Sequence, residues 1–222
     1  KVVSWLPLYH DMGLIAAFHT PLARGIATVQ VDPFEWVMAP GLLLEAAHAE
    51  NATLSWLPNF AYSFMAERVR DEDIEGVRLD SLRLLINCSE PVRDASHRQF
   101  LERFASRGAR PEMLATCYAM AETTFAVTQS KVGRPPDTRR VGRSALAAGM
   151  ATAPASGEVE SMLVSSGDPI DGCEVRVVDQ DGCDVPPDRT GEIAIRSVSL
   201  FNGYRHSPEK TAAAMRDGWF MS

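Results

Sequence analysis

Cysteine is scarce in this sequence, and its spacing carries no metal or disulfide signature. Only four cysteines occur in 222 residues, and none stands in a Cys-x-x-Cys pair or at a zinc-type spacing to a histidine. We therefore expect reduced thiols, with neither a disulfide framework nor a cysteine-held metal. The four positions are Cys88, Cys117, Cys173 and Cys183.

Positive charge and long apolar runs are lacking as well. The 22 lysines and arginines are outnumbered by 29 acidic residues, and the formal net charge is -7. Nucleic acids and anionic membranes bind clustered lysine and arginine, so this balance argues against both. No apolar run reaches the ~20 residues of a membrane span, and no charged start leads into a signal-like apolar core. We expect a globular, cytoplasmic protein without a transmembrane segment.

Three motifs of common enzyme classes are missing. Because there is no Gly-x-Ser-x-Gly, no strained turn exposes a serine nucleophile, which argues against a Ser-His-Asp hydrolase. Neither the Gly-x-x-x-x-Gly-Lys-Ser/Thr loop nor Gly-x-Gly-x-x-Gly occurs. Any nucleotide chemistry must therefore use a different phosphate cradle, or one that lies outside these residues.

Short apolar runs alternate with helical periodicity over the first 125 residues. This alternation is typical of βαβ units and a mostly parallel sheet with flanking helices. The predicted strands cover 1–6, 26–31, 52–57, 81–87 and 112–117. The clearest helix is predicted over 93–108, with a glycine C-cap at its end. Its buried face comprises His97, Phe100, Leu101 and Phe104.

Polar segments follow four of the predicted strands. They read PLYHDMG, PNFAYS, NCSEP and YAMAETT, at 7–13, 58–63, 87–91 and 118–124. Because the carboxyl ends of parallel strands meet at one edge of a sheet, we expect these segments to share a ligand-binding crevice.

The amino-acid composition and the periodicity change after about residue 125. Residues 131–164 are rich in Gly, Pro, Arg and Ala, and we interpret them as an insertion or long connection. Within them SALAAGM, at 144–150, is apolar enough to pack against a neighbouring surface. Short β-type runs at 162–167, 173–179, 191–197 and 200–204 predict part of an antiparallel barrel. The predicted units are therefore 1–130, 131–164 and 165–222.

Taken alone, the candidate site residues leave alternatives open. Tyr118 could stack on a heterocycle and Glu122 could hold a divalent cation, but a core tyrosine and an acid at a helix start fit the spacing equally well. The turn after residue 87 is an ordinary end for a buried strand. A zinc site at His10 and Asp11 would need further ligands, and the other histidines supply none at a matching spacing.

Five ordered segments together carry a family resemblance. SWLPLYHDMGLI, LINCSEPV, CYAMAETTF, GEIAIRSVSLFNGY and DGWF, in this order and at these separations, resemble the adenylate-forming superfamily of acyl ligases and synthetases. The resemblance covers the whole chain. The segment from Val132 to Val164, together with NCSEPVR and PNFAYSFMAER, is most similar to the fatty acyl-AMP ligase branch, which carries an insertion here.

The resemblance implies an activity and a fold. It implies ATP-dependent activation of a fatty or other carboxylic acid to an acyl-adenylate with release of pyrophosphate, then transfer to the thiol of an acyl carrier protein or of CoA. It implies a flavodoxin-like α/β part followed by part of an antiparallel β-barrel. An acyl-CoA ligase and a non-catalytic nucleotide or acyl-chain binding module are the alternatives.

The resemblance also implies roles for single residues. Glu122 would bind Mg²⁺ between the ATP phosphates, and Tyr118 would pack on adenine. His10 would stand near the acyl carboxylate. The implied adenine-pocket residues are Asn87, Cys88, Ser89, Glu90, Ala119 and Met120, and the implied acyl-tunnel residues are Asn59, Phe60 and Tyr62.

Two departures and one omission qualify this resemblance. Ala119 stands where the family usually has Gly, and Cys88 with Ser89 replaces a more usual Gly-Ala pair. The family's phosphate loop, ribose-binding Asp and mobile domain with its catalytic Lys are expected outside these 222 residues. We therefore expect a fragment of the large domain that is inactive on its own.

Overall fold

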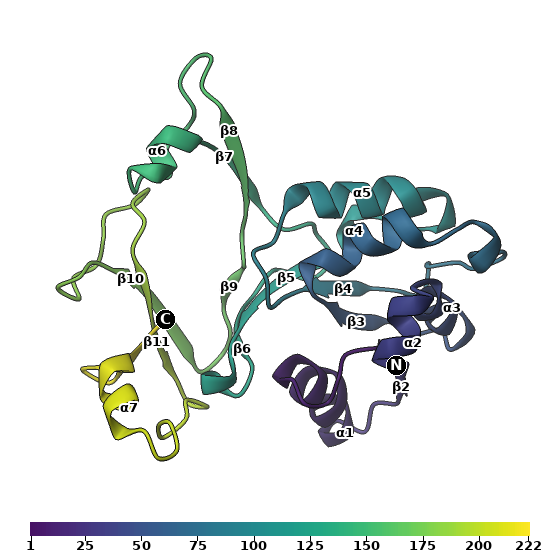
Figure 1. Ribbon diagram of the computed structural model, residues 1–222, viewed down its shortest axis with the longest axis horizontal. Coiled ribbons are helices and arrows are strands. Elements are labelled where there is room, and N and C mark those ends of the chain that lie inside the picture. The colour runs from purple at the N-terminus through teal and green to yellow at the C-terminus, as the bar shows by residue number, and fades with distance from the viewer.

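The computed structural model describes residues 1–222 and contains three sheets (Figure 1). A seven-stranded mixed sheet holds the first half of the chain. A two-stranded ribbon and a four-stranded antiparallel sheet follow. No helix has the length and apolar character needed to cross a bilayer.

The large sheet has the strand order β2-β1-β3-β4-β5-β6-β9. Its first five strands pair in parallel, while β6 and β9 are antiparallel additions at one edge. The order 2-1-3-4-5 is that of flavodoxin-like folds, so this prediction is confirmed. The strands are β1 (Val2–Ser4), β2 (Thr28–Gln30), β3 (Leu54–Leu57), β4 (Leu84–Asn87), β5 (Leu114–Ala119), β6 (Ala126–Gln129) and β9 (Asp168–Pro169). All five strands predicted in this region are present, most of them shorter than expected.

Helices cover both faces of this sheet. In Figure 1, α4 and α5 lie over one face, and the π-helix η1 with α1 lies on the opposite side. The helices are η1 (Met12–His19), α1 (Thr20–Ala23), α2 (Pro33–Met38), α3 (Gly41–Ala49), α4 (Asn59–Arg68) and α5 (Asp94–Phe104). Four short 3₁₀ turns are η2 (Glu72–Ile74), η3 (Ala105–Arg107), η4 (Pro111–Met113) and η5 (Ala121–Thr123).

The predicted helix over 93–108 is confirmed as α5 with η3 as its last turn. His97, Phe100 and Phe104 are buried, as the apolar face requires. Gly108 follows with φ +97°, in the left-handed region that favours glycine at a helix end. A side chain there would also collide with the Asp80 carboxylate.

One hydrophobic core lies between this sheet and its helices. It comprises 29 buried residues, all of them between Val3 and Phe125. Trp5 and Trp36 stack inside it with ring centroids 3.8 Å apart. Burying each large apolar side chain stabilises the fold by roughly 1.5–3 kcal/mol, so this core can hold the strand ends of the site rigidly.

The segment predicted as an insertion forms a ribbon with a short helix. β7 (Thr138–Gly142) and β8 (Glu160–Val164) pair antiparallel, and α6 (Arg143–Ala147) lies between them. No residue of α6 is buried. The SALAAGM segment is attached to the 186–190 turn instead, because Thr190 N donates to Gly149 O at 2.9 Å and Ala151 N donates to Asp188 O at 2.7 Å.

The antiparallel sheet predicted for the last part is confirmed. Its order is β10-β11-β13-β12, with β10 (Cys173–Val178), β11 (Glu192–Ser197), β12 (Met215–Arg216), β13 (Trp219–Met221) and the helix α7 (Pro208–Ala214). The predicted strand at 200–204 is wrong, since this stretch is an irregular loop in which Gly203 has φ +134°. The run predicted at 162–167 overlaps the end of β8 and so belongs to the ribbon.

Candidate functional site

The ends of three neighbouring strands form the centre of the candidate site. The ladder aligns Leu57 with Asn87 and Asn87 with Thr116, so β3, β4 and β5 reach the same edge of the sheet side by side. The strand order also reverses between β1 and β3, and such switch points open ligand crevices in α/β sheets. The polar segments predicted to converge therefore begin next to one another.

A hollow of about 280 Å³ lies beyond β4 and β5. Its lining residues are Ser89, Glu90, Pro91, Val92, Cys117, Tyr118, Ala119 and Ser166. Four of the residues that the sequence proposed for nucleotide binding are thus brought together here. Asn87, Cys88 and Met120 do not line it. Ser89 has φ +71°, which bends the chain sharply as it enters the hollow.

Glu122 does not line this hollow. It lies in the η5 turn, which follows Ala119 of the lining after one residue, and it is held by a loop from the second sheet. The Tyr204 hydroxyl donates to Glu122 Oε1 at 2.7 Å, and Phe201 N donates to the Glu122 carbonyl oxygen at 2.7 Å. Ser199 Oγ also donates to Thr123 O at 2.8 Å. Because the carboxylate stabilises its proton, the pKa of Tyr204 is raised.

The surroundings of the Glu122 carboxylate fit the role of a Mg²⁺ ligand. Tyr204 is the one protein side chain that donates to it, through Oε1. No group of three or more Asp, Glu, His or Cys side chains could form a protein cage for a metal ion. Mg²⁺ commonly takes one or two carboxylates and completes its shell with water and substrate phosphates. Glu122 supplies one carboxylate of that pattern, and the lining of the hollow contains one other, Glu90.

Asn87 belongs to a buried polar network behind the hollow. Its Nδ2 donates to Asn59 Oδ1 at 3.2 Å and lies 2.9 Å from His97 Nε2. Asn59 Oδ1 also accepts from Arg93 N at 2.9 Å, and Asn59 Nδ2 donates to Ser96 Oγ at 3.2 Å. Burial lowers the pKa of His97 to about 4, so its ring is neutral and Nε2 can accept. The network joins the end of β4 to the start of α4.

The three residues proposed for the acyl tunnel do not share one surface. Asn59 and Phe60 line a second hollow of about 480 Å³, which also includes Glu90. Phe60 is 45% exposed and its ring meets Trp5 and Trp36 edge-on, each with centroids 6.1 Å apart. Tyr62, by contrast, is fully buried and packs against His97 and Phe100.

Glu90 is a wall of both hollows. Its Oε2 accepts from Phe60 N at 2.9 Å, which satisfies one of the free amides at the start of α4. The hollow at Tyr118 and the hollow at Phe60 are therefore neighbours that share one carboxylate.

His10 lies on an exposed turn after β1 and lines neither hollow. Its Nδ1 is 2.7 Å from Asp11 Oδ1. Asp11 Oδ1 accepts from Met12 N at 2.7 Å and so caps η1. The turn folds back so tightly that a side chain at Gly13 would collide with the Pro7 carbonyl.

Sequence reasoning missed Tyr204 as a site residue. Its signal was present in the Asn-Gly-Tyr stretch, but we interpreted that stretch as a strand. A glycine before a polar aromatic residue is also typical of a sharp loop. Ser166, which lines the nucleotide hollow, carried no signal in a Ser-Ser-Gly turn.

The comparisons with known proteins agree along most of the chain. A family model described as AMP-binding enzyme matches residues 1–205. The long-chain-fatty-acid–AMP ligase FadD28 of Mycobacterium tuberculosis is 33% identical over 213 residues, covering 95% of this chain and 36% of the relative. A putative fatty-acid–CoA ligase, fadD25, of the same species is 33% identical over 211 residues with the same coverage. The chain thus spans about a third of the length of the curated relatives it matches.

A solved structure agrees with the fold. The fatty acyl-adenylate ligase from L. pneumophila, in complex with acyl adenylate and pyrophosphate, superposes with a TM-score of 0.92 at 33% identity. The match covers 100% of this chain and 40% of that one. The strand order, the clustered strand ends and these matches lead to one conclusion: the chain belongs to the AMP-binding enzyme family.

Proposed function

We propose that the intact protein that contains this chain activates a fatty or other carboxylic acid with ATP, giving an acyl-adenylate and pyrophosphate. One observation carries the proposal: an aromatic-walled hollow at Tyr118 lies a single turn from the Glu122 carboxylate, which Tyr204 holds in place. The family match and the relatives named as long-chain-fatty-acid–AMP ligases support it.

The reaction needs what this edge of the sheet supplies. A carboxylate oxygen of the acid attacks the α-phosphorus of ATP and pyrophosphate leaves, so two anions must approach one another. Mg²⁺ held by Glu122 would offset that repulsion and stabilise charge on the leaving group. Tyr118 would stack on adenine, and Ser89, Glu90 and Ala119 would line its pocket. Asn87, Cys88 and Met120 would support these residues from behind.

The acid would lie on the other side of Glu90, in the hollow at Asn59 and Phe60. Phe60 and Phe64 give this hollow an apolar wall on α4. Tyr62 would act from the core, by packing against His97 and Phe100 behind that wall. His10, on the turn after β1, would approach the acyl carboxylate.

A direct test is Glu122→Gln in the full-length enzyme, which keeps the size of the side chain and removes its charge. We expect pyrophosphate release to fall by about 10²–10³-fold, on the scale of losing one preorganised electrostatic group. The Mg²⁺ concentration for half-maximal rate should also rise. The matched control is Glu72→Gln, an exposed acid in the η2 turn. An unchanged rate and an unchanged Mg²⁺ requirement would contradict the metal role of Glu122.

The acceptor is proposed to be the phosphopantetheine thiol of an acyl carrier protein. In the acyl-AMP ligase branch an insertion restrains a mobile domain and disfavours transfer to CoA, and we assign that role to 131–164. A restraint of ~1.4 kcal/mol would shift a two-state equilibrium tenfold. A second candidate acceptor is CoA itself, favoured by the relative named as a putative fatty-acid–CoA ligase.

The base of the β7–β8 ribbon offers a place to delete the insertion and so test which acceptor is used. Ser165 N donates to Asp137 O at 2.8 Å and closes its base, so residues 139–163 can be replaced by a short Gly-Ser turn. We expect the undeleted enzyme to release acyl-AMP when CoA is present and to load a carrier protein. The deletion should raise the yield of acyl-CoA. Abundant acyl-CoA from the undeleted enzyme would favour the second candidate.

A further inference from the structure

Two cysteines stand side by side behind the nucleotide hollow. Asn87 and Thr116 are partners in the parallel ladder of β4 and β5, and the residue after each of them is a cysteine, Cys88 just past the end of β4 and Cys117 within β5. Cys88 and Cys117 therefore stand at equivalent positions in the ladder, where side chains point to the same face of the sheet. Neighbouring strands lie about 4.8 Å apart, within the ~4.4–6.8 Å between Cα atoms that a disulfide spans.

The two thiols lie close enough to influence each other. Their contact lowers the pKa of Cys88 and raises that of Cys117. The Cys117 thiol also donates to the Tyr118 carbonyl oxygen at 3.6 Å. Both side chains belong to the hydrophobic core, but the proposed adenylation chemistry makes no use of their thiol reactivity.

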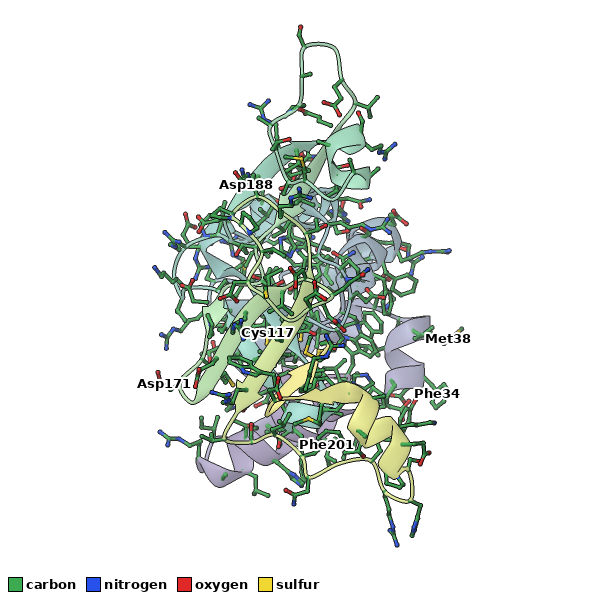
Figure 2. All side chains as sticks on the ribbon, turned by 90° about the vertical axis from the view of Figure 1, so that its left-hand side faces the viewer. Phe34, Met38, Cys117, Asp171, Asp188 and Phe201 are labelled. Atoms are coloured by element: carbon green, nitrogen blue, oxygen red, sulfur yellow. The ribbon has the colours of Figure 1, made fainter.

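The pair is buried but can be reached by a small molecule. Cys88 is fully buried, while Cys117 is 4% exposed and lines the hollow with Tyr118. Figure 2 shows Cys117 in the interior of the molecule, away from the labelled outer residues. The remaining two cysteines lie elsewhere, with Cys183 exposed and Cys173 on β10. A small oxidant that enters the hollow therefore meets Cys117 first.

We propose that Cys88 and Cys117 are a modification site, at which hydrogen peroxide closes an intrachain disulfide between β4 and β5. Cys117, which borders the hollow, passes its proton to the Cys88 thiolate and attacks one peroxide oxygen; the O–O bond breaks, and the departing hydroxide takes a proton to become water. The Cys117 sulfenic acid is then attacked by the Cys88 sulfur, and its oxygen leaves as a second water. In total the two thiols lose two electrons and two protons, and peroxide is reduced to two waters.

The disulfide would tie together the two segments that form the hollow. Cys88 is followed by Ser89 and Glu90, and Cys117 is followed by Tyr118, all of them lining residues. If the proposed function holds, oxidation lowers ATP-dependent pyrophosphate release and a reductant restores it. The formation of the bond is independent of that function and is measured by itself.

The test uses the reduced full-length protein in its folded state. After exposure to hydrogen peroxide, free thiols are blocked with N-ethylmaleimide under denaturing conditions, and the digest is examined by mass spectrometry. We expect a peptide joining Cys88 to Cys117, lighter by two hydrogens than its separate parts and abolished by dithiothreitol. Cys173→Ser together with Cys183→Ser should leave it unchanged.

Two variants keep the proposal open to refutation. Cys88→Gly restores the residue more usual in the resembling family, and Cys117→Ser removes the other sulfur. Each should abolish the linked peptide. The proposal is overturned if Cys88 and Cys117 are still free thiols after peroxide, and so react with N-ethylmaleimide, while Cys183 is oxidised. It is also overturned if the linked peptide forms only in protein that was denatured before oxidation.

Discussion

The first 130 residues and the last 58 residues are stabilised in different ways. The first region contains the whole 29-residue core. Beyond residue 130 only five hydrophobic residues are buried, namely Val141, Val178, Ala194, Ile195 and Phe220. The first region therefore rests on buried apolar area, whereas the second rests on strand pairing and on its attachment to the first. A site that takes residues from both regions therefore has one side supported by the hydrophobic core and another side supported mainly by hydrogen bonds.

Besides the pairing of β9 with β6, part of the attachment falls on the candidate metal ligand. The loop 199–204 contacts the η5 turn through the hydrogen bonds from Tyr204, Phe201 and Ser199. Figure 2 shows Phe201 beneath the second sheet, in the loop that precedes α7. The orientation of Glu122 thus depends on the weaker region, although the residue itself lies in the stronger one.

The largest expected effect comes from the first core. Phe100 is fully buried against Tyr62 and Phe104, so Phe100→Ala should lower the free energy of unfolding by about 3–5 kcal/mol. The matched control is Phe34→Ala, because Phe34 is 80% exposed and points outward from α2 (Figure 2). Urea denaturation of the full-length enzyme gives both values. Equal losses in the two variants would contradict the view that burial in this core stabilises the first region.

Acid should weaken the first region through His97. Its pKa is about 4 in the folded chain and about 6.5 when unfolded, so the unfolded state binds more protons between these values. The stabilising effect is present above pH ~6.5 and is lost as the pH falls toward 4, up to about 3 kcal/mol. Hydrogen exchange of the α5 amides, corrected for intrinsic rates, measures the loss. His97→Gln should flatten the pH dependence, and an unchanged slope in that variant would assign the effect to other groups.

The smallest effect probes the connection between the regions. Tyr204→Phe removes the donor to Glu122 and leaves the ring, so the Mg²⁺ requirement should rise and turnover should fall by about tenfold, with little change in global stability. A double-mutant cycle with Glu122→Gln separates this role from a general one. If Tyr204 acts through the carboxylate, the second substitution adds little to the first. Fully additive losses would contradict that role.

Much of the first region could be predicted from the sequence because burial leaves a periodic pattern. The strands around residues 84–87 and 114–119 are short apolar runs, and α5 repeats its apolar residues at helical spacing. The error at 200–204 fell in the region with little burial. There an apolar pair, Leu200 and Phe201, reflects loop contacts rather than a strand face.

The sequence could predict only those site residues that lie at the ends of neighbouring strands. Ser89 and Glu90 follow β4, and Tyr118 and Ala119 end β5, so the pairing of these two strands brings all four to one hollow. Tyr204 reaches Glu122 across 82 positions, and no local pattern encodes such a contact. Tyr62 was assigned to the acyl tunnel from its place beside Phe60, but successive positions on a helix face different sides, and its ring lies in the core.

Glu90 has a consequence for how the two substrates would sense each other. One carboxylate forms a wall of both hollows and accepts the amide at the start of α4. A ligand that moves this side chain from either hollow changes the shape and charge of the other, and exposes the Phe60 amide. If ligands of the two hollows move Glu90 in this way, their binding is thermodynamically linked, and by reciprocity each ligand alters the affinity for its neighbour by the same factor.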